Sequence, residues 1–134
     1  MATRYVWAKN PRPPKLKLAR SKKDELLAQV QAFVAAHFTA HMQPPPKNPR
    51  FNYVTGYFVK WQGSYIVVFA RYACPSPNAI SPSFDAPLAR LGCFPGDRFS
   101  LWARRHTDEW IVIEDGITLN KCFEALRTNP WFEQ

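Results

Sequence analysis

Cysteines are few in this sequence, and they form no pattern that would join them to one another or to a metal. Cys74, Cys93 and Cys122 are odd in number and widely spaced, without a C-x-x-C motif. This spacing argues against a disulfide framework and against a zinc knuckle. No run of about 18 apolar residues occurs, so no transmembrane helix is expected. Residues 1–7 also lack the apolar segment of a secretory signal, so a cytoplasmic location without a membrane partner is predicted.

Catalytic and cofactor-binding motifs are missing as well. The sequence has no P-loop, no G-x-G-x-x-G and no G-x-S-x-G. His37 and His41 are four residues apart on a predicted helix, a spacing that can turn two imidazoles toward one metal ion. No H-E-x-x-H motif and no intervening carboxylate supports them, so two partly exposed histidines at a helix end are the preferred interpretation. No catalytic residue, cofactor or metal site is predicted.

The charge that is present has an uneven distribution. The chain of 134 residues has a net charge of +8. Residues 1–23 contain no acidic residue and eight basic ones, whereas the segment from Asp24 onward has equal numbers of acidic and basic residues. The apolar content of 46% indicates a globular protein of one domain. We therefore divide the chain into a basic extended arm, residues 1–20, and a single α+β domain, residues 21–134.

The arm has the composition of a segment that follows a polyanion. Its prolines break any helical period, and its cations alternate with aromatic rings that can stack on bases. The arm residues predicted to bind nucleic acid or another anion are Arg4, Trp7, Lys9, Arg12, Lys15, Lys17 and Arg20. The alternative is a solvated tail, or an arm that packs Tyr5 and Trp7 on an uncovered face of the domain.

Periodicity predicts an antiparallel sheet with two helices. Ser21 is expected to cap a helix that carries an apolar stripe and ends near Met42, before three prolines. A last short helix begins after Thr118. Aromatic and β-branched runs joined by short turns predict a meander of about five strands, with both helices packed on it. The expected strands cover residues 51–61, 65–72, 84–91, 98–105 and 109–114.

The first two strands are apolar on both faces, which is unusual for a sheet with one face in water. Tyr57, Val59 and Trp61 lie on one side, and Val54 and Phe58 lie on the other. The second face is therefore expected to be covered by the arm, by a loop or by a second copy of the chain. A homodimer follows as one hypothesis, since large exposed apolar patches mark interfaces.

Arginines recur on the predicted strands. Arg71 and Arg105 each fall on a strand face that is otherwise apolar, which favours a buried ion pair or an anion site because a guanidinium fits carboxylate or phosphate. The alternative is pairing with nearby carboxylates. Further basic residues on adjacent strands are Arg90, Arg98, Arg104 and His106.

The loop from Cys74 to Ser83 contains three prolines and is expected to be stiff. It is predicted to offer four polar side chains as a binding loop: Ser76, Asn78, Ser81 and Ser83. The alternative is a structural crossover that covers the sheet edge. Cys74 with His106 as its base would make a third kind of protein, a small hydrolase or redox enzyme.

Several longer strings resemble a known family. They are Pro44-Pro45-Pro46, Arg50-Phe51-Asn52-Tyr53, the stretch 72–84 (YACPSPNAISPSF), the stretch 105–110 (RHTDEW) and Asn129-Pro130-Trp131-Phe132. Together they resemble a family of small uncharacterised bacterial proteins, a domain of unknown function, over about residues 44–134. The resemblance implies a bacterial, cytoplasmic protein and transfers no catalytic residue.

The sequence therefore predicts a non-enzymatic binding protein that contacts a polyanion, nucleic acid, through its basic arm and its strand arginines. The runner-up is a homo-oligomeric adaptor that binds protein partners through an apolar sheet face.

Overall fold

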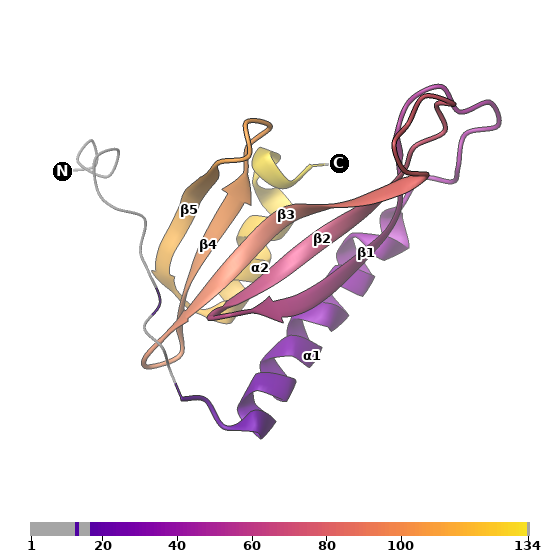
Figure 1. Ribbon diagram of the computed structural model, residues 1–134. Coiled ribbons are helices and arrows are strands. Elements are labelled where there is room, and N and C mark those ends of the chain that lie inside the picture. The colour runs from indigo at the N-terminus through magenta and orange to yellow at the C-terminus, as the bar shows by residue number, and fades with distance from the viewer. Residues whose placement is uncertain (1–12, 14–16, 134) are drawn as a thin grey trace.

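Five antiparallel strands form one sheet in the order β1-β2-β3-β4-β5 (Figure 1). The computed structural model describes Pro13 and residues 17–133. The strands are β1 (Tyr53–Gln62), β2 (Tyr65–Ala73), β3 (Ser83–Phe94), β4 (Arg98–Arg104) and β5 (Trp110–Ile117). Every neighbour in the sheet is also a neighbour in sequence, as short turns favour. The predicted α+β fold with a five-stranded antiparallel meander is thus confirmed.

The tight turns depend on residues that tolerate positive φ. The β1–β2 hairpin turns at Gly63 and Ser64, between the two predicted strands, and Gly63 has φ +60°. Glycine at the first central position is typical of a type II′ turn, which matches the twist of the flanking strands. Asp97 and Asp108 adopt φ values of 55° and 65° in the other two turns. Aspartate reaches this region more readily than most residues, because its side chain hydrogen-bonds locally.

The two helices are α1 (Arg20–His37) and α2 (Leu119–Thr128). The predicted cap at Ser21 is wrong: α1 begins one residue earlier, and Ala19 at the N-cap makes no side-chain hydrogen bond. The predicted cap of α2 is confirmed, since the Thr118 hydroxyl accepts from the Lys121 amide at 3.3 Å. Neither helix combines the length and the apolar character needed to cross a lipid bilayer.

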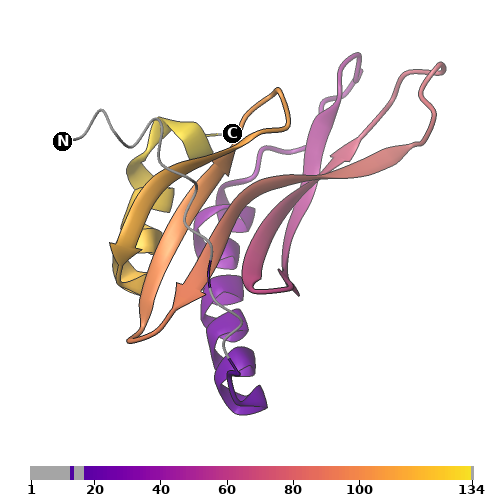
Figure 2. The ribbon, with the colours of Figure 1, turned by 60° about the vertical axis from the view of Figure 1, so that its left-hand side comes forward.

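Both helices lie on the same side of the sheet (Figures 1 and 2). α1 packs mainly on β1, and α2 packs on β4 and β5. The stripe predicted for α1 is buried at Leu26, Val30, Val34 and Phe38. These side chains meet inward-facing residues of the strands, each contributing about 1.5–3 kcal/mol before chain entropy is subtracted. The core therefore occupies the space between the helices and the sheet.

We call the opposite side of the sheet the outer face. It has buried side chains of its own although neither α1 nor α2 covers it: Val67 is 2% exposed and Trp102 is fully buried. Gly92 lies beside Trp102, and a Cβ atom there would be 3.0 Å from Trp102 Cζ3 and 3.2 Å from Pro13 Cγ. The chain's own N-terminal segment therefore contacts the outer face at Pro13.

The absence of a side chain at Gly92 is expected to be a packing requirement. Gly92→Ala should lower the free energy of unfolding by roughly 1–3 kcal/mol, because backbone or rings must move to admit the methyl group. Gly56→Ala is the matched control, since nothing lies within 4 Å of its added Cβ. Urea denaturation measures both variants. Equal stability of the two would contradict the tight packing of Trp102 against β3.

Candidate anion-binding face of the sheet

One row of paired residues crosses the outer face from edge to edge. Lys60 pairs with Val67, Val67 with Arg90, Arg90 with Trp102, and Trp102 with Val112. Residues directly opposite on antiparallel strands point to the same face. The row therefore places cations and rings side by side on the outer face.

The centre of this face is an arginine enclosed by rings. The Cζ atom of Arg90 is 4.1 Å from the ring centroid of Tyr65, 4.8 Å from that of Trp102 and 4.6 Å from that of Trp110. The Arg104 guanidinium lies over the same Trp110 ring, at 5.0 Å. A guanidinium over an aromatic face is attracted by the ring quadrupole. We call these five residues, Tyr65, Arg90, Trp102, Arg104 and Trp110, the arginine cluster.

Arg90, at the centre of the arginine cluster, has no negative charge paired with it in the described part of the chain. Among the residues that the structure describes, no carboxylate lies within ion-pair distance of Arg90. Arg104 has only a long contact of 3.7 Å to Asp108. The Nε atoms of both arginines are buried without a hydrogen-bond partner. Burial lowers the pKa of Arg90, the Arg104 charge lowers it further, and Tyr65 acts in the opposite direction. The cluster is therefore suited to receive an anion.

A second set of stacked cations lies toward β1. Lys60 Nζ is 5.1 Å from the Phe69 ring centroid, and Arg71 Cζ is 5.0 Å from that of Phe58. The two phenyl rings stack on each other with centroids 4.9 Å apart. The apolar side chains that suggested an uncovered face are thus shielded in part by the stems of cations, as long basic side chains often do.

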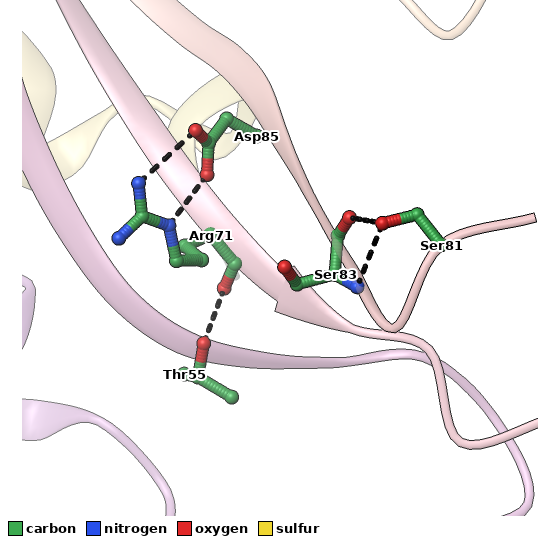
Figure 3. Close-up of polar contacts among 5 residues, drawn as sticks. All are labelled: Thr55, Arg71, Ser81, Ser83 and Asp85. Carbon is green, nitrogen blue, oxygen red and sulfur yellow. Dashed lines mark hydrogen bonds and ion pairs between the residues drawn. The ribbon is translucent and has the colours of Figure 1, made fainter.

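Arg71 and Arg105, the two strand arginines predicted to bind an anion, each have a carboxylate nearby. Arg71 donates to Asp85 at 2.7 and 3.1 Å (Figure 3). That hydrogen bond is the main cause that raises the pKa of Arg71 and lowers the pKa of Asp85. Arg105 follows the last residue of β4 and lies 3.6 Å from Glu109. Asp85 thus compensates the charge of Arg71, whereas Arg105 has a long contact to Glu109 similar to that of Arg104 to Asp108.

Two of the predicted arm residues lie in the described part of the chain. Lys17 is exposed, and Arg20 makes a long contact of 3.8 Å with Asp24 in which both side chains face solvent. Arg4, Trp7, Lys9, Arg12 and Lys15 lie outside the described residues. Exposed pairs of this kind contribute little to stability, so Arg20 keeps its charge available.

The predicted binding loop uses its own side chains to hold its backbone. The Ser76 hydroxyl accepts from the Asn78 amide at 3.2 Å. The Ser81 hydroxyl donates to the Ser83 carbonyl at 2.8 Å and accepts from its amide at 3.4 Å (Figure 3). Such side-chain turns stiffen a loop without help from packing. All four side chains are exposed, and the hydroxyls of Ser76 and Ser81 are engaged with the backbone of the loop itself.

The histidines and cysteines form no common site. His41 Nδ1 donates to the His37 carbonyl at 2.9 Å, and no group of three potential metal ligands occurs within the described ranges. Burial and the nearby His41 charge lower the pKa of His37.

The structure keeps Cys74 and His106 apart. Cys74 follows β2, whose last pairing with β3 is at Ser83. His106 follows β4, whose last pairing with β3 is at Ala89. Six residues of strand span about 20 Å, so the pair is not assembled.

The residues that the sequence did not single out are the rings of the arginine cluster. Arg90 and Arg104 were recognisable as strand arginines, but Tyr65, Trp102 and Trp110 gave no signal of their own. Their convergence depends on register, since Arg90 pairs with Trp102 and Arg104 with Trp110. Two tryptophans and two arginines at paired positions of predicted neighbouring strands were the only available hint.

Comparison with known proteins assigns the chain to a family. The family model described as Domain of unknown function (DUF3024) matches residues 18–133, so the chain belongs to this family. Neither a curated protein nor a solved structure matches it. The match spans both helices, all five strands and the arginine cluster, and it brings no activity with it.

Cysteine reactivity tests the burial on the helix side of the sheet. Burial raises the pKa of Cys93 to about 11 and the pKa of Cys122 to about 12, whereas Cys74 is only half-buried. Because the thiolate is the reacting species, iodoacetamide near pH 8 should label Cys74 alone in the native protein. Peptide mass spectrometry identifies the labelled site, with urea-unfolded protein as the control in which all three react. Native labelling of Cys122 as fast as Cys74 would refute this burial.

Proposed function

For this member of the DUF3024 family, we propose a non-enzymatic binding function: the protein holds a polyanion, nucleic acid, through its basic arm and the outer face of its sheet. The observation that carries the proposal is Arg90, a partly buried cation enclosed by three rings without a carboxylate partner in the described chain. A phosphate group would supply the missing negative charge.

The charge balance of the outer face supports this proposal. Lys60, Arg71, Arg90 and Arg104 all stack on its rings. The carboxylate of Asp85 is engaged by Arg71, and that of Asp115 accepts a hydrogen bond from buried Ser100. Of the four stacked cations, Lys60 and Arg90 thus form no ion pair with a carboxylate in the described part of the chain. Phosphates that meet such cations release condensed counterions, which favours binding.

The arm and the outer face are connected at one described point. Pro13 lies against Gly92, which is two residues from Arg90 on β3 and therefore on the same face. Basic residues precede and follow Pro13 in the sequence at Arg12 and Lys15. The arm therefore meets the folded domain beside the arginine cluster, where both can contact the same polyanion.

A cytoplasmic location belongs to the same proposal, since nucleic acid is abundant there. The resemblance of the sequence to small bacterial proteins is compatible with it. Nothing in the proposed function needs a cofactor or a catalytic group.

The second candidate is a homo-oligomeric adaptor that binds protein partners through an apolar sheet face. Two large apolar side chains favour it. Phe51, just before β1, is 80% exposed, and Ile80, in the loop before β3, is fully exposed. Large exposed apolar groups often mark protein interfaces. The stacked cations on the outer face favour a polyanion instead.

Salt dependence tests the proposed function. Log K for binding a random DNA duplex should fall linearly with log salt, with a slope near −7 if all eight basic residues of the segment 1–23 meet phosphates. Replacing Arg4, Lys9, Arg12, Lys15 and Lys17 by glutamine should reduce the slope by roughly 4 to 5, since each contact contributes about 0.9. Fluorescence anisotropy between about 50 and 200 mM salt measures both slopes.

Lys47→Gln with Arg50→Gln is the control for the arm variant, because both residues are exposed in a loop outside the arm and the outer face. It should leave the slope nearly unchanged. Absence of any binding at the lowest salt would end the proposal.

Sedimentation equilibrium tests the adaptor. A homo-oligomer predicts a mass above the 15.5 kDa of one chain that rises with protein concentration. It also predicts that Phe51→Ser with Ile80→Ser returns the protein to a monomer. A single-chain mass at the highest soluble concentration removes this candidate.

A further inference from the structure

The arginine cluster contains two like charges held close together. Arg90 and Arg104 both lie within 5.0 Å of the Trp110 ring centroid. Each charge disfavours the other: burial is the main cause that lowers the pKa of Arg90, and the Arg104 charge lowers it to a smaller extent. An anion placed between the guanidiniums relieves the repulsion. The pair is therefore a stronger anion site than either arginine alone.

Ring stacking also fixes how the guanidiniums can bind. The Arg90 guanidinium lies over three rings and its Nε is buried, so its terminal N–H groups are the donors left for a ligand. A side chain already held by three rings loses little freedom on binding. This edge of donors suits the oxygens of a phosphate, which accept two parallel hydrogen bonds.

The strand arginines outside the arginine cluster differ from Arg90 in how many of their donors are free to bind an anion. Arg71 also stacks on a ring, but Asp85 already occupies its donors at 2.7 and 3.1 Å. A phosphate there must first displace a carboxylate. The arginine cluster, rather than the Arg71 or Arg105 position, is thus where a backbone phosphate gains most.

The shape of the outer face bears on the kind of nucleic acid. Five strands about 4.8 Å apart make a surface roughly 19 Å across, which is wider than the ~12 Å major groove of duplex DNA. The arginine cluster extends from Tyr65 on β2 across β3 and β4 to Trp110 on the edge strand β5. A duplex would touch such a face only through its outer phosphates.

A single strand can use the rings as well. Tyr65 is half-buried beside the Arg90 guanidinium, and Trp110 is half-buried beside the guanidiniums of both arginines. Unpaired bases have free faces and stack on such rings, whereas the bases of a duplex are already stacked within it. The same surface would therefore contact both the phosphates and the bases of a single strand.

We infer that the ligand of the outer face is single-stranded nucleic acid, with Arg90 and Arg104 binding one backbone phosphate and the adjoining bases stacking at Tyr65 and Trp110. This inference rests on the proposed function and narrows it. The arm supplies attraction to any polyanion, and the arginine cluster selects the unpaired strand.

The test compares a labelled oligonucleotide with the duplex of the same sequence. The wild-type protein should bind the single strand at least about tenfold more tightly, since base stacking on rings contributes roughly that factor or more per base. Arg90→Gln with Arg104→Gln should reduce the single-strand salt slope by about 0.7, which corresponds to the one phosphate that the two arginines share. Trp110→Leu should lower single-strand affinity about tenfold and leave duplex affinity nearly unchanged.

Matched variants separate these effects from general loss of charge or of structure. Arg50→Gln with Lys121→Gln removes the same charge from exposed positions off the arginine cluster and should not change the preference for the single strand. Arg104→Gln alone, at a side chain that is 27% exposed, keeps the test available if the Arg90 variant unfolds. Thermal unfolding of each variant verifies the fold.

The outcomes distinguish this inference from the proposed function. Equal binding of the two ligands, with a slope that Arg104→Gln leaves unchanged, overturns the inference while the proposed function stands. Competition by millimolar inorganic phosphate without binding of either oligonucleotide overturns it in favour of a small phosphate ligand. Absence of salt-dependent binding by the wild-type protein removes the proposed function and the inference together.

Discussion

The stacking of Arg90 among Tyr65, Trp102 and Trp110 is the interaction on which the outer face depends. A sheet that is apolar on both sides must cover both. On one side α1 and α2 bury the core residues. On the other side, Trp102 is fully buried although neither helix reaches it. The Arg90 guanidinium lies over the Trp102 ring, and Pro13 lies beside the neighbouring Gly92.

Covering the outer face with an arginine differs from covering it with an apolar side chain in one respect that matters for the proposed function. A leucine in place of Arg90 would cover the rings equally well, but it would bring no charge and no donors. The arginine introduces a partly desolvated cation, and the described chain provides it no carboxylate. Under the proposed function, the same side chain would both cover the sheet and bind the ligand. Arg71 shows the alternative arrangement, in which a carboxylate on the next strand compensates the charge.

The fold was predictable from the sequence because it depends on local patterns. Apolar spacing located α1, and short turns at Gly63 and at Asp97 located the hairpins. The start of α1 was wrong because Ser21 lies within the first turn of the helix, where its hydroxyl caps nothing. Boundaries of this kind depend on neighbouring contacts rather than on propensity.

The candidate site was predictable only in part. Charge distribution pointed to the arm, and strand position pointed to arginines. Which arginine stays without a partner depends on register: Arg71 lies opposite Asp85, whereas Arg90 lies opposite Trp102. A bulge between Val68 and Phe69 shifts this register by one residue along β3. No periodicity in the sequence reveals such a shift.

The most direct measurement is a two-dimensional NMR titration of the full chain with a short single-stranded oligonucleotide, observing arginine Nε–H and tryptophan indole signals. The account predicts that Arg90, Arg104 and Trp110 shift most and saturate together, while Arg71 moves little until Asp85 is replaced by asparagine. Shifts confined to the arm or to the helix-covered side, with the arginine cluster unmoved at saturation, would contradict it.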